Sequence, residues 1–299
     1  MTKKGIILVL CLMIFSAFFM SSSLLAENNA GDRHIVFFQA TKYNSKLANS
    51  IDYIFNDLVK PEDQLTIFTP VKPYGFSQKT RKSQTKGKLI KLTKDVLKRD
   101  IAIGSASYQN VLNNMAQVSL DIGNDMGISS SGNSSGFSVS LSTVKRNLVN
   151  YRQLLEEMRN LRKLNEDLFI KLSGMLKKSK AKAYFYIIYQ KEYRVIPDRK
   201  VMDALMKNEN IRFDVVEVFQ QENVEEFINV EKVSKALKKS NIMLHFFYIN
   251  TNEKRKRGTE YKEFSGDVYS IFSKISKNTG GKVVTTTKPK SAFKEINTK

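Results

Sequence analysis

The stretch HIVFFQATKYNS, residues 34–45, decides the fold. Its first part, IVFFQ, is a short apolar run of the kind that is buried in a parallel β-sheet, and its second part is a polar turn that opens a helix. Apolar residues then recur at helical spacing from Leu47 to Leu58, and QLTIFT at 64–69 begins a second strand. Residues 34–69 therefore predict a βαβ unit, whose crossover should be right-handed.

The same alternation of strands and amphipathic helices returns near residue 183. Apolar runs predict further strands at 183–190, 242–249 and 282–287. Residues 211–219 predict another strand or extended segment, and Pro70, Pro73 and Gly75 leave room only for a short edge strand. The fold class that follows is α/β, with a doubly wound, mostly parallel open sheet flanked by helices.

Residues 121–182 interrupt this alternation and predict an insertion. A Gly/Ser-rich loop at 127–142 precedes a helical pattern from 143 to about 180, which would span roughly 55 Å as one helix. Arg162 and Asn165 interrupt its apolar stripe, which favours packing on the preceding helix or on the domain over a coiled coil. We therefore expect one α/β domain formed by 27–120 and 183–299, with a helical insertion at 121–182.

The first 26 residues predict a secretory signal peptide. Lys3 and Lys4 precede the apolar run GIILVLCLMIFSAFF, and small residues follow as far as Ala26. A retained anchor is the alternative, but the apolar run of about 15 residues is shorter than the ~20 that a span needs. Cys11, the one cysteine, lies in this segment, so we expect an exported chain, periplasmic or extracellular, without disulfides.

The chain is strongly basic, with a formal net charge of +20. The densest run, Lys72 to Asp100, would bind an anionic lipid or glycan, since nucleic acid is not an expected partner of an exported protein. A solvated surface, or a lysine-rich composition without a ligand, explains the same charges. The candidate anion-binding residues are Lys79, Arg81, Lys82, Lys86, Lys88 and Lys91.

Four stretches in this order resemble the von Willebrand factor type A (VWA) domain in its bacterial exported form. They are HIVFFQATKYNS (34–45), KPEDQLTIFTP (60–70), AYFYIIYQK (183–191) and IFSKISKNTGGKVVTTTKPKSAFKEI (271–296). The last is the most specific, because in that family a helix that ends in Thr-Gly-Gly leads into the final strand and helix. The resemblance implies a VWA-like, doubly wound domain.

The resemblance also implies where a metal site would lie, and this sequence departs from it there. The family holds a metal with an Asp-x-Ser-x-Ser turn, a threonine on a second loop and an aspartate on a third. Glutamines stand where both aspartates would, and a hard cation needs carboxylate charge. We expect a degenerate site without metal or cofactor, whose positions are Gln39, Thr41, Tyr43, Ser105, Ser107, Gln190 and Lys191.

Two interpretations of these positions remain open. Gln39 and Gln190 could close the sheet edge by hydrogen-bonding each other or nearby backbone, since an amide both donates and accepts. Alternatively, the neutral pocket, with Lys42 and Lys191 beside the glutamines, could accept a carboxylate from a partner.

No catalytic constellation emerges from the sequence. It contains no nucleophile elbow and no phosphate loop, and His34 and His245 fall in apolar strands where we expect core histidines. We therefore expect a non-catalytic protein-binding or assembly module, with another exported or envelope protein as its partner. The sequence does not set the oligomeric state.

Overall fold

The computed structural model describes residues 31–128, 140–162, 164–177, 179, 181–220, 227–251 and 257–297. The predicted signal peptide at 1–26, residues 129–139 of the Gly/Ser loop and residues 252–256 lie outside this range. Within the described residues, no helix is both long and apolar enough to span a membrane.

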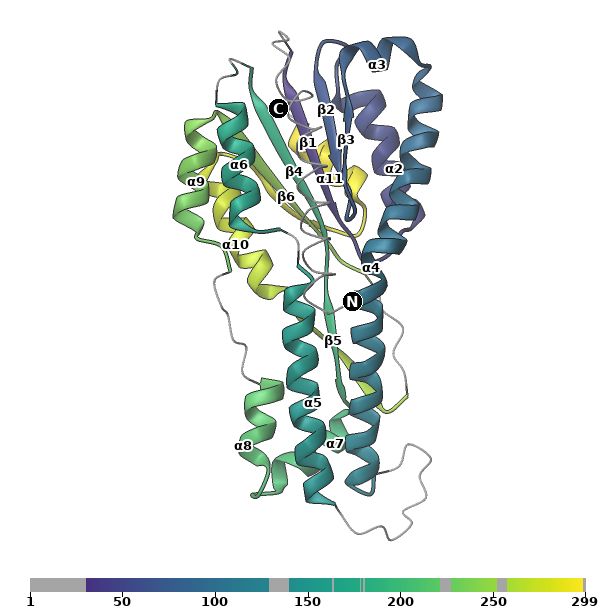
Figure 1. Ribbon diagram of the computed structural model, residues 1–299, viewed down its shortest axis with the longest axis vertical. Helices are drawn as coiled ribbons and strands as arrows, with labels where there is room; N and C mark the ends of the chain where they lie inside the picture. Colours follow the sequence, from purple (N-terminus) through teal and green to yellow (C-terminus); the bar gives the residue numbers. More distant parts are fainter. Residues whose placement is uncertain are drawn as a thin grey trace, which may run out of the picture.

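A six-stranded sheet forms the centre of the molecule (Figure 1). Its strands are β1 (Arg33–Gln39), β2 (Gln64–Phe68), β3 (Pro73–Phe76), β4 (Ala183–Gln190), β6 (Ile242–Ile249) and β8 (Val283–Thr286). The spatial order is β3-β2-β1-β4-β6-β8, and every pair is parallel except β2–β3. This confirms the doubly wound, mostly parallel sheet and the short edge strand. The strand order reverses between β1 and β4, at the switch point of such a sheet.

Helices cover both faces of the sheet, because its strands are apolar on both sides. One face carries α2 (Ser45–Tyr53) with its continuation η1 (Ile54–Leu58), the first part of α4 (Lys86–Asp125) and α11 (Pro289–Asn297). The other carries α6 (Glu166–Leu176), α9 (Val230–Lys239) and α10 (Gly266–Asn278). Phe38 packs under the first layer and Phe37 under the second. We call the sheet and these helices the head.

A second body, which we call the stalk, extends from the C-terminal edge of the parallel strands (Figure 1). It contains α4 from Tyr108 onward and the elements α5 (Leu141–Asn160), β5 (Tyr193–Pro197), α7 (Arg199–Lys207), α8 (Arg212–Val215), η2 (Val216–Gln220) and β7 (Thr259–Glu263). These elements bury their own apolar cluster. The 40 residues of α4 run about 60 Å and belong to both bodies.

Hydrogen bonds from side chains to the backbone fasten strand β5 to the stalk helices. The hydroxyls of Tyr151 and Ser119 both donate to the Val195 carbonyl, at 2.8 and 3.1 Å. Strand β5 pairs with β7 alone in a two-stranded sheet, which by itself would be only marginally stable. Contacts with α4 and α5 therefore complete this two-stranded sheet.

The single helix predicted from 143 to 180 is wrong, because the structure has two helices there. Helix α5 ends at Asn160, and α6 begins at Glu166 after the Asn165 side chain accepts a hydrogen bond from the Leu168 amide, at 2.9 Å. An asparagine in this position is a helix N-cap. Helix α6 lies on the sheet of the head, although it falls within the predicted insertion at 121–182, whose boundaries stay a prediction.

The strand predicted at 211–219 is also wrong, because these residues form α8 and η2. Ile211, Val215, Val218 and Phe219 are buried at helical spacing against the stalk core. Their β-branched and aromatic side chains favour a strand when considered locally, and packing against α5 overrides that preference.

The turn at Thr279-Gly280-Gly281 joins α10 to β8 and has strict backbone requirements. Gly280 has a φ of 79°, in the left-handed region. A Cβ atom on Gly281 would lie 1.8 Å from the Leu244 carbonyl oxygen. The Thr279 hydroxyl accepts a hydrogen bond from the Leu244 amide at 3.2 Å, so the turn packs directly on β6.

Alanine substitutions should separate these requirements. Gly281→Ala forces a carbon atom into backbone and should lower the free energy of unfolding by at least about 2 kcal/mol. Gly280→Ala should cost about 1 to 2 kcal/mol, because an L-residue is strained at that φ. Urea denaturation measures both values.

Gly174→Ala is the matched control. Gly174 lies inside α6, exposed, with no neighbouring atom within 4 Å of an added Cβ. Alanine there should raise stability by about 0.5 to 1 kcal/mol. If Gly281→Ala were as stable as Gly174→Ala, the close approach of the turn to β6 would be refuted.

Candidate functional site

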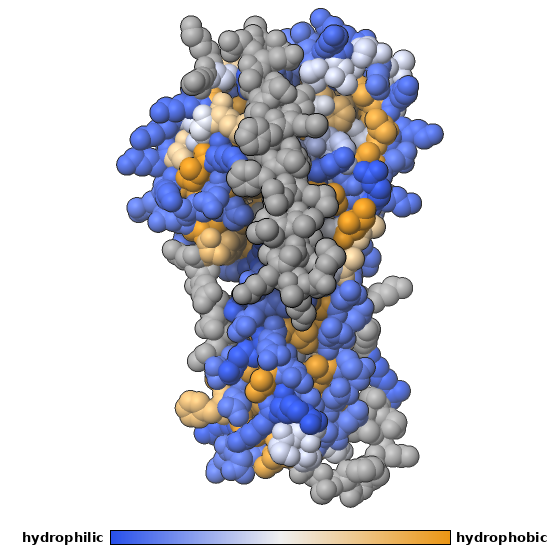
Figure 2. Space-filling model, viewed as in Figure 1, coloured by the Kyte–Doolittle hydropathy of each residue, from blue (hydrophilic) through white to orange (hydrophobic). Residues whose placement is uncertain are grey.

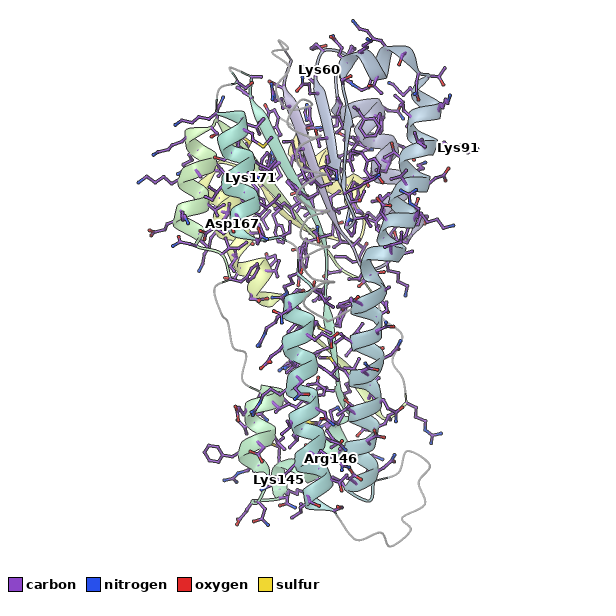
Figure 3. All side chains as sticks on the ribbon, in the orientation of Figure 1. Lys60, Lys91, Lys145, Arg146, Asp167 and Lys171 are labelled. Atoms are coloured by element: carbon purple, nitrogen blue, oxygen red, sulfur yellow. The ribbon has the colours of Figure 1, made fainter. Side chains whose placement is uncertain are left out.

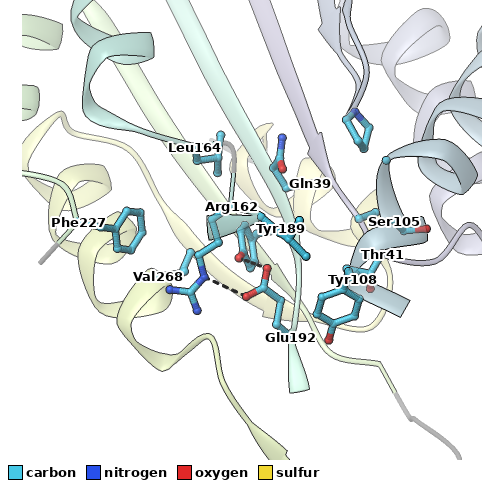
Figure 4. A pocket seen from close by; sticks show the side chains of 14 residues that line it. Gln39, Thr41, Ser105, Tyr108, Arg162, Leu164, Tyr189, Glu192, Phe227 and Val268 are labelled. Carbon is cyan, nitrogen blue, oxygen red and sulfur yellow. Dashed lines mark hydrogen bonds and ion pairs between the residues drawn. The ribbon is translucent and has the colours of Figure 1, made fainter. Parts of the chain in front are cut away.

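A small cavity lies at the switch point, where the C-terminal ends of β1 and β4 separate (Figure 4). Ligands of doubly wound proteins bind at this place. The wall is formed by the ends of β1, β2 and β4, by α4, by the α5–α6 connection and by α10. Its residues are Gln39, Ala40, Thr41, Pro70, Gly104, Ser105, Tyr108, Leu161, Arg162, Leu164, Tyr189, Glu192, Phe227 and Val268.

The volume of this cavity limits its chemistry. It is about 50 Å³, whereas small-molecule sites usually measure roughly 300 to 1,000 Å³. A few water molecules would fill it.

The stalk is the reason for the small volume. Described segments cross between head and stalk at this edge along α4, through Arg162 between α5 and α6, through Lys191 and Glu192 between β4 and β5, and through Phe264 and Ser265 between β7 and α10. In Figure 1 the stalk continues directly from the C-terminal ends of the parallel strands. The edge that would face a ligand therefore faces the protein's own chain.

Gln190 forms hydrogen bonds with the turn after β1. Its side chain is buried, and its Oε1 accepts hydrogen bonds from the backbone amides of Thr41 and Lys42, both at 2.8 Å. A carboxylate would serve as well as an acceptor here, but the amide performs the task without charge. The expected bond between Gln190 and nearby backbone is confirmed.

Gln39 and Gln190 do not meet. Successive side chains of a strand point to opposite faces, and Gln39 pairs in register with Tyr189, so Gln39 shares the face of Tyr189. Gln190 points to the other face. The expected alternative, a hydrogen bond between the two glutamines, is wrong, and Gln39 lines the cavity instead.

A buried ion-pair network fills the wall beside Gln39 (Figure 4). Arg162, whose side chain is 7% exposed, donates from Nε to Glu192 Oε2 at 3.1 Å and pairs through Nη1 with Asp267. Its Nη2 donates to the Phe264 carbonyl at 2.9 Å. The Tyr189 hydroxyl donates to Glu192 Oε1 at 2.6 Å. Three segments far apart in sequence meet at one guanidinium.

Burial and charge pairing oppose each other in this network. It raises the pKa of Glu192, and the Arg162 charge opposes that rise. Burial alone would lower the pKa of Arg162, but Glu192, Tyr189 and Asp267 outweigh it and the pKa is raised. A carboxyl with a raised pKa in a cleft is a candidate acid or base. Here Arg162 donates to one Glu192 oxygen and Tyr189 to the other, so the network holds these segments together.

Other predicted site residues are scattered. Ser105 and Ser107, predicted in a loop, lie within α4; Ser105 lines the cavity and Ser107 is exposed. The loop prediction is wrong because α4 continues through Gly104, which lets the helix approach Pro70: an added Cβ would lie 2.4 Å from the proline Cβ. Tyr43 packs against the core under α2.

Lys191 is already paired. Its Nζ lies 2.5 Å from Glu263 Oε2 and 5.9 Å from the centres of the Tyr193 and Tyr248 rings. A partner's carboxylate would have to compete with Glu263. This weakens the interpretation of the edge as a carboxylate receptor.

The residues at this edge do not fit a hard cation. Among the described residues, no three His, Cys, Asp or Glu side chains come together in a way that could hold a metal ion. Within the described cavity wall, Glu192 carries the single carboxylate, and Arg162 occupies it. Carboxylate charge is what offsets the dehydration of Mg²⁺.

The basic candidates lie elsewhere, on α3 (Gln78–Ser83) and the start of α4. Lys79, Lys82, Lys86, Lys88 and Lys91 are exposed, and Lys91 points away from the helix into solvent (Figure 3). Arg81 differs from them because it donates to the carbonyls of Lys60, Pro61 and Asp63. Arg81 thus fastens α3 to the turn before β2.

Both histidines are buried in strands, as predicted. His34 bonds Tyr186 and Asp63, at 3.1 and 3.2 Å. His245 Nδ1 accepts from the Lys282 amide at 3.1 Å, and burial together with the Lys282 charge lowers its pKa to about 4. Neither lines the cavity.

Comparison of the chain with protein-family models, curated proteins and solved structures gave no match. The functional argument therefore rests on the fold and on the geometry of the site.

Sequence reasoning missed Arg162, Tyr189 and Glu192 as a unit. Arg162 carried a signal, since it interrupts an apolar stripe, as did Glu192, which comes two residues after an apolar strand. Their pairing joins positions 30 residues apart, and Asp267 lies 105 residues from Arg162. Local patterns do not reveal such pairs.

Removing the Arg162 guanidinium should show how much the network contributes to the free energy of unfolding. Arg162→Met leaves Glu192 and Asp267 buried without their cation and should lower the free energy of unfolding by about 3 to 5 kcal/mol. Combined with Glu192→Gln, the loss should fall short of the sum of the two single losses by about 1 to 3 kcal/mol. Chemical denaturation of the four proteins measures this coupling.

Arg152→Met is the matched control, because Arg152 pairs with Glu217 at 2.7 Å on the surface of the stalk. About half of each side chain is exposed, and such pairs contribute at most about 1 kcal/mol. Additive effects of Arg162→Met and Glu192→Gln would contradict the coupled network.

Proposed function

We propose that this protein is an exported, non-catalytic protein-binding or assembly module. In this proposal its head is a VWA-like domain whose metal site has been lost. The mostly parallel, doubly wound sheet with flanking helices is compatible with that family. Export rests on the predicted signal peptide.

One observation carries the proposal: the functional edge of the sheet is closed by the protein's own stalk. The residual cavity measures about 50 Å³, and its charged residues neutralise one another. A site of this kind has little room for a substrate, and the one carboxylate of its described wall, Glu192, is bonded to Arg162 and Tyr189. These features favour a structural role for this edge, as the junction between head and stalk.

The junction makes head and stalk one elongated body. Helix α4 passes through both, and the Arg162 network bonds the stalk connections to the ends of the strands. A body of this shape suits a protein that presents surfaces at fixed separations.

Exposed apolar side chains favour a protein as the partner. Phe213 on α8 is 87% exposed, and Val149 on α5 is 53% exposed. On α4, Leu92 is 51% exposed. Aromatic residues such as Phe213 are enriched where proteins bind one another.

The second candidate is binding of an anionic lipid or glycan. The observation in its favour is that five of the six predicted lysine and arginine candidates are exposed on two consecutive helices. Such binding would be electrostatic and would weaken with salt.

Metal should not stabilise the protein. We expect millimolar Mg²⁺ or Ca²⁺ to leave the melting temperature unchanged relative to EDTA-treated protein, because a ligand that binds only the native state must raise it. Differential scanning calorimetry provides the measurement. A reproducible rise with Mg²⁺ would show that the edge holds a cation after all and would overturn the loss of the metal site.

Salt and charge reversal separate the two candidate partners. We expect immobilised protein to capture a partner from envelope extract at both about 50 mM and about 500 mM NaCl, because apolar contacts are not screened. The triple variant Lys86→Glu, Lys88→Glu, Lys91→Glu should capture it equally well.

The control reverses three exposed lysines on α9: Lys235→Glu, Lys238→Glu and Lys239→Glu. Binding to phosphatidylglycerol vesicles is measured in parallel by sedimentation. Loss of all binding at high salt and in the α4 triple variant alone would favour the lipid or glycan interpretation over the protein-binding one.

A further inference from the structure

A groove of about 390 Å³ runs between the edge strand β3 and helices α3 and α4. Its described lining is Ile67, Thr69, Lys72, Tyr74, Gly75, Phe76, Thr80, Gln84, Leu89, Leu92, Thr93, Val96, Leu97 and Arg99. Figure 2 shows hydrophobic surface between the edge of the sheet and the upper part of α4, bordered by hydrophilic residues. This volume lies in the range of ligand sites, unlike the cavity at the switch point.

One wall of the groove is the backbone of β3, whose outward hydrogen-bonding groups have no strand partner among the described residues. Among the described residues, β3 pairs with β2 and has no strand on its other side. The Thr69 amide donates to the Lys72 carbonyl at 3.1 Å, which fixes the alternation of the antiparallel ladder. Tyr74 and Phe76 therefore bond to β2, whereas Pro73 and Gly75 direct their backbone groups outward. Pro73, which lacks an N–H, fits this assignment.

The floor of the groove is apolar. Leu89, Leu97 and Phe76 are buried beneath it, while Leu92 on the wall is half exposed. The Gln84 Oε1 atom is buried, and no described residue donates to it. The groove thus offers an apolar surface, an unused amide acceptor and the outward backbone of Gly75.

The rim is positively charged. Lys72 and Arg99 are exposed, and Lys72 Nζ lies 5.2 Å from the centre of the Tyr74 ring. The Asp100 carboxylate is buried and accepts from Thr69, Tyr74 and Arg99, so its charge is already used. Lys88 and Lys91 on α4 add to the positive charge outside.

We propose that this groove binds an extended peptide segment of the partner protein, which adds to β3 as a further strand. Gly75 exchanges backbone hydrogen bonds with the peptide, an apolar side chain of the peptide packs against Leu89 and Leu92, and acidic side chains face Lys72 and Arg99. Strand addition beside a helix uses main-chain bonds for affinity and alternate side chains for specificity. This inference rests on the proposed function and assigns the groove beside β3 as the surface that binds the partner.

The unpaired backbone decides between a peptide and a lipid. An acyl chain could fill the apolar floor but would leave the Gly75 N–H and C=O without partners, which is costly for groups removed from water. A peptide satisfies them. A second copy of this chain pairing through β3 is the remaining occupant, and the oligomeric state reports it.

The probe is a library of random octapeptides displayed on phage and selected on the full mature chain. We expect selected peptides to alternate apolar and acidic residues. Leu92→Glu should weaken binding of the selected consensus peptide at least about tenfold, because it places a charge on the apolar wall. Ile103→Glu is the matched control, similarly exposed on the same helix and outside the described groove lining, and should change affinity less than about twofold.

The backbone contact has its own test. Gly75→Pro removes the outward N–H and spares the ladder to β2, and N-methylation of alternate peptide residues removes the matching donors. Each should weaken binding at least about tenfold in fluorescence anisotropy. Circular dichroism of the variants checks that the fold is intact. Equal affinity of the protein for the N-methylated and the unmodified peptide would overturn strand addition.

Other outcomes also decide against the proposal. Failure to enrich any peptide over the Leu92→Glu protein, purely acidic selected peptides that dissociate in high salt, or a dimer abolished by Gly75→Pro would each refute it. Capture of the partner from extract by the Leu92→Glu variant distinguishes failure of the groove proposal from failure of the proposed protein-binding function. If this variant retains the partner that the wild type captures, the groove is wrong and the protein-binding function stands; if neither captures one, the function itself fails.

Discussion

The Arg162 guanidinium is the interaction on which the arrangement of head and stalk depends. It collects Glu192 from the β4–β5 link, Asp267 from the start of α10 and the Phe264 carbonyl from the β7–α10 link. A buried charge of this kind is stable only when its partners are present and well oriented. These connections therefore have to come together in one conformation, and that conformation places the stalk against the end of the sheet.

The same residue explains the path of the chain between the two bodies. Arg162 follows α5 directly and turns inward, Asn165 then caps α6, and α6 packs on the sheet through Phe169, Leu172 and Leu176. A straight helix through these positions would carry the charge away from Glu192 and the apolar face of α6 away from the head. The break in the helix is thus required by both the ion pairs and the core.

The head was predictable from sequence because its determinants are local. Each parallel strand is an apolar run bounded by polar turns, and the turn at Thr279 to Gly281 needs glycine for reasons of backbone geometry alone. The stalk was less predictable, since β5 and β7 mix polar and apolar residues and α8 contains strand-favouring side chains. In the site, the neutral character of Gln39 and Gln190 was visible in sequence, but their opposite directions follow from strand register.

The structure relocates the available binding chemistry from the end of the sheet to its side. At the C-terminal edge, Gln190 Oε1 holds a turn, Lys191 pairs with Glu263 and Arg162 pairs with Glu192, so the charged groups Lys191, Arg162 and Glu192 are already paired within the chain. At the β3 edge the described backbone retains an open side, next to apolar and basic side chains. A fold whose C-terminal sheet edge is covered by its own stalk can still bind a strand at its side. The outward backbone groups of β3 have no strand partner among the described residues, and they are the physical reason to look for a ligand there.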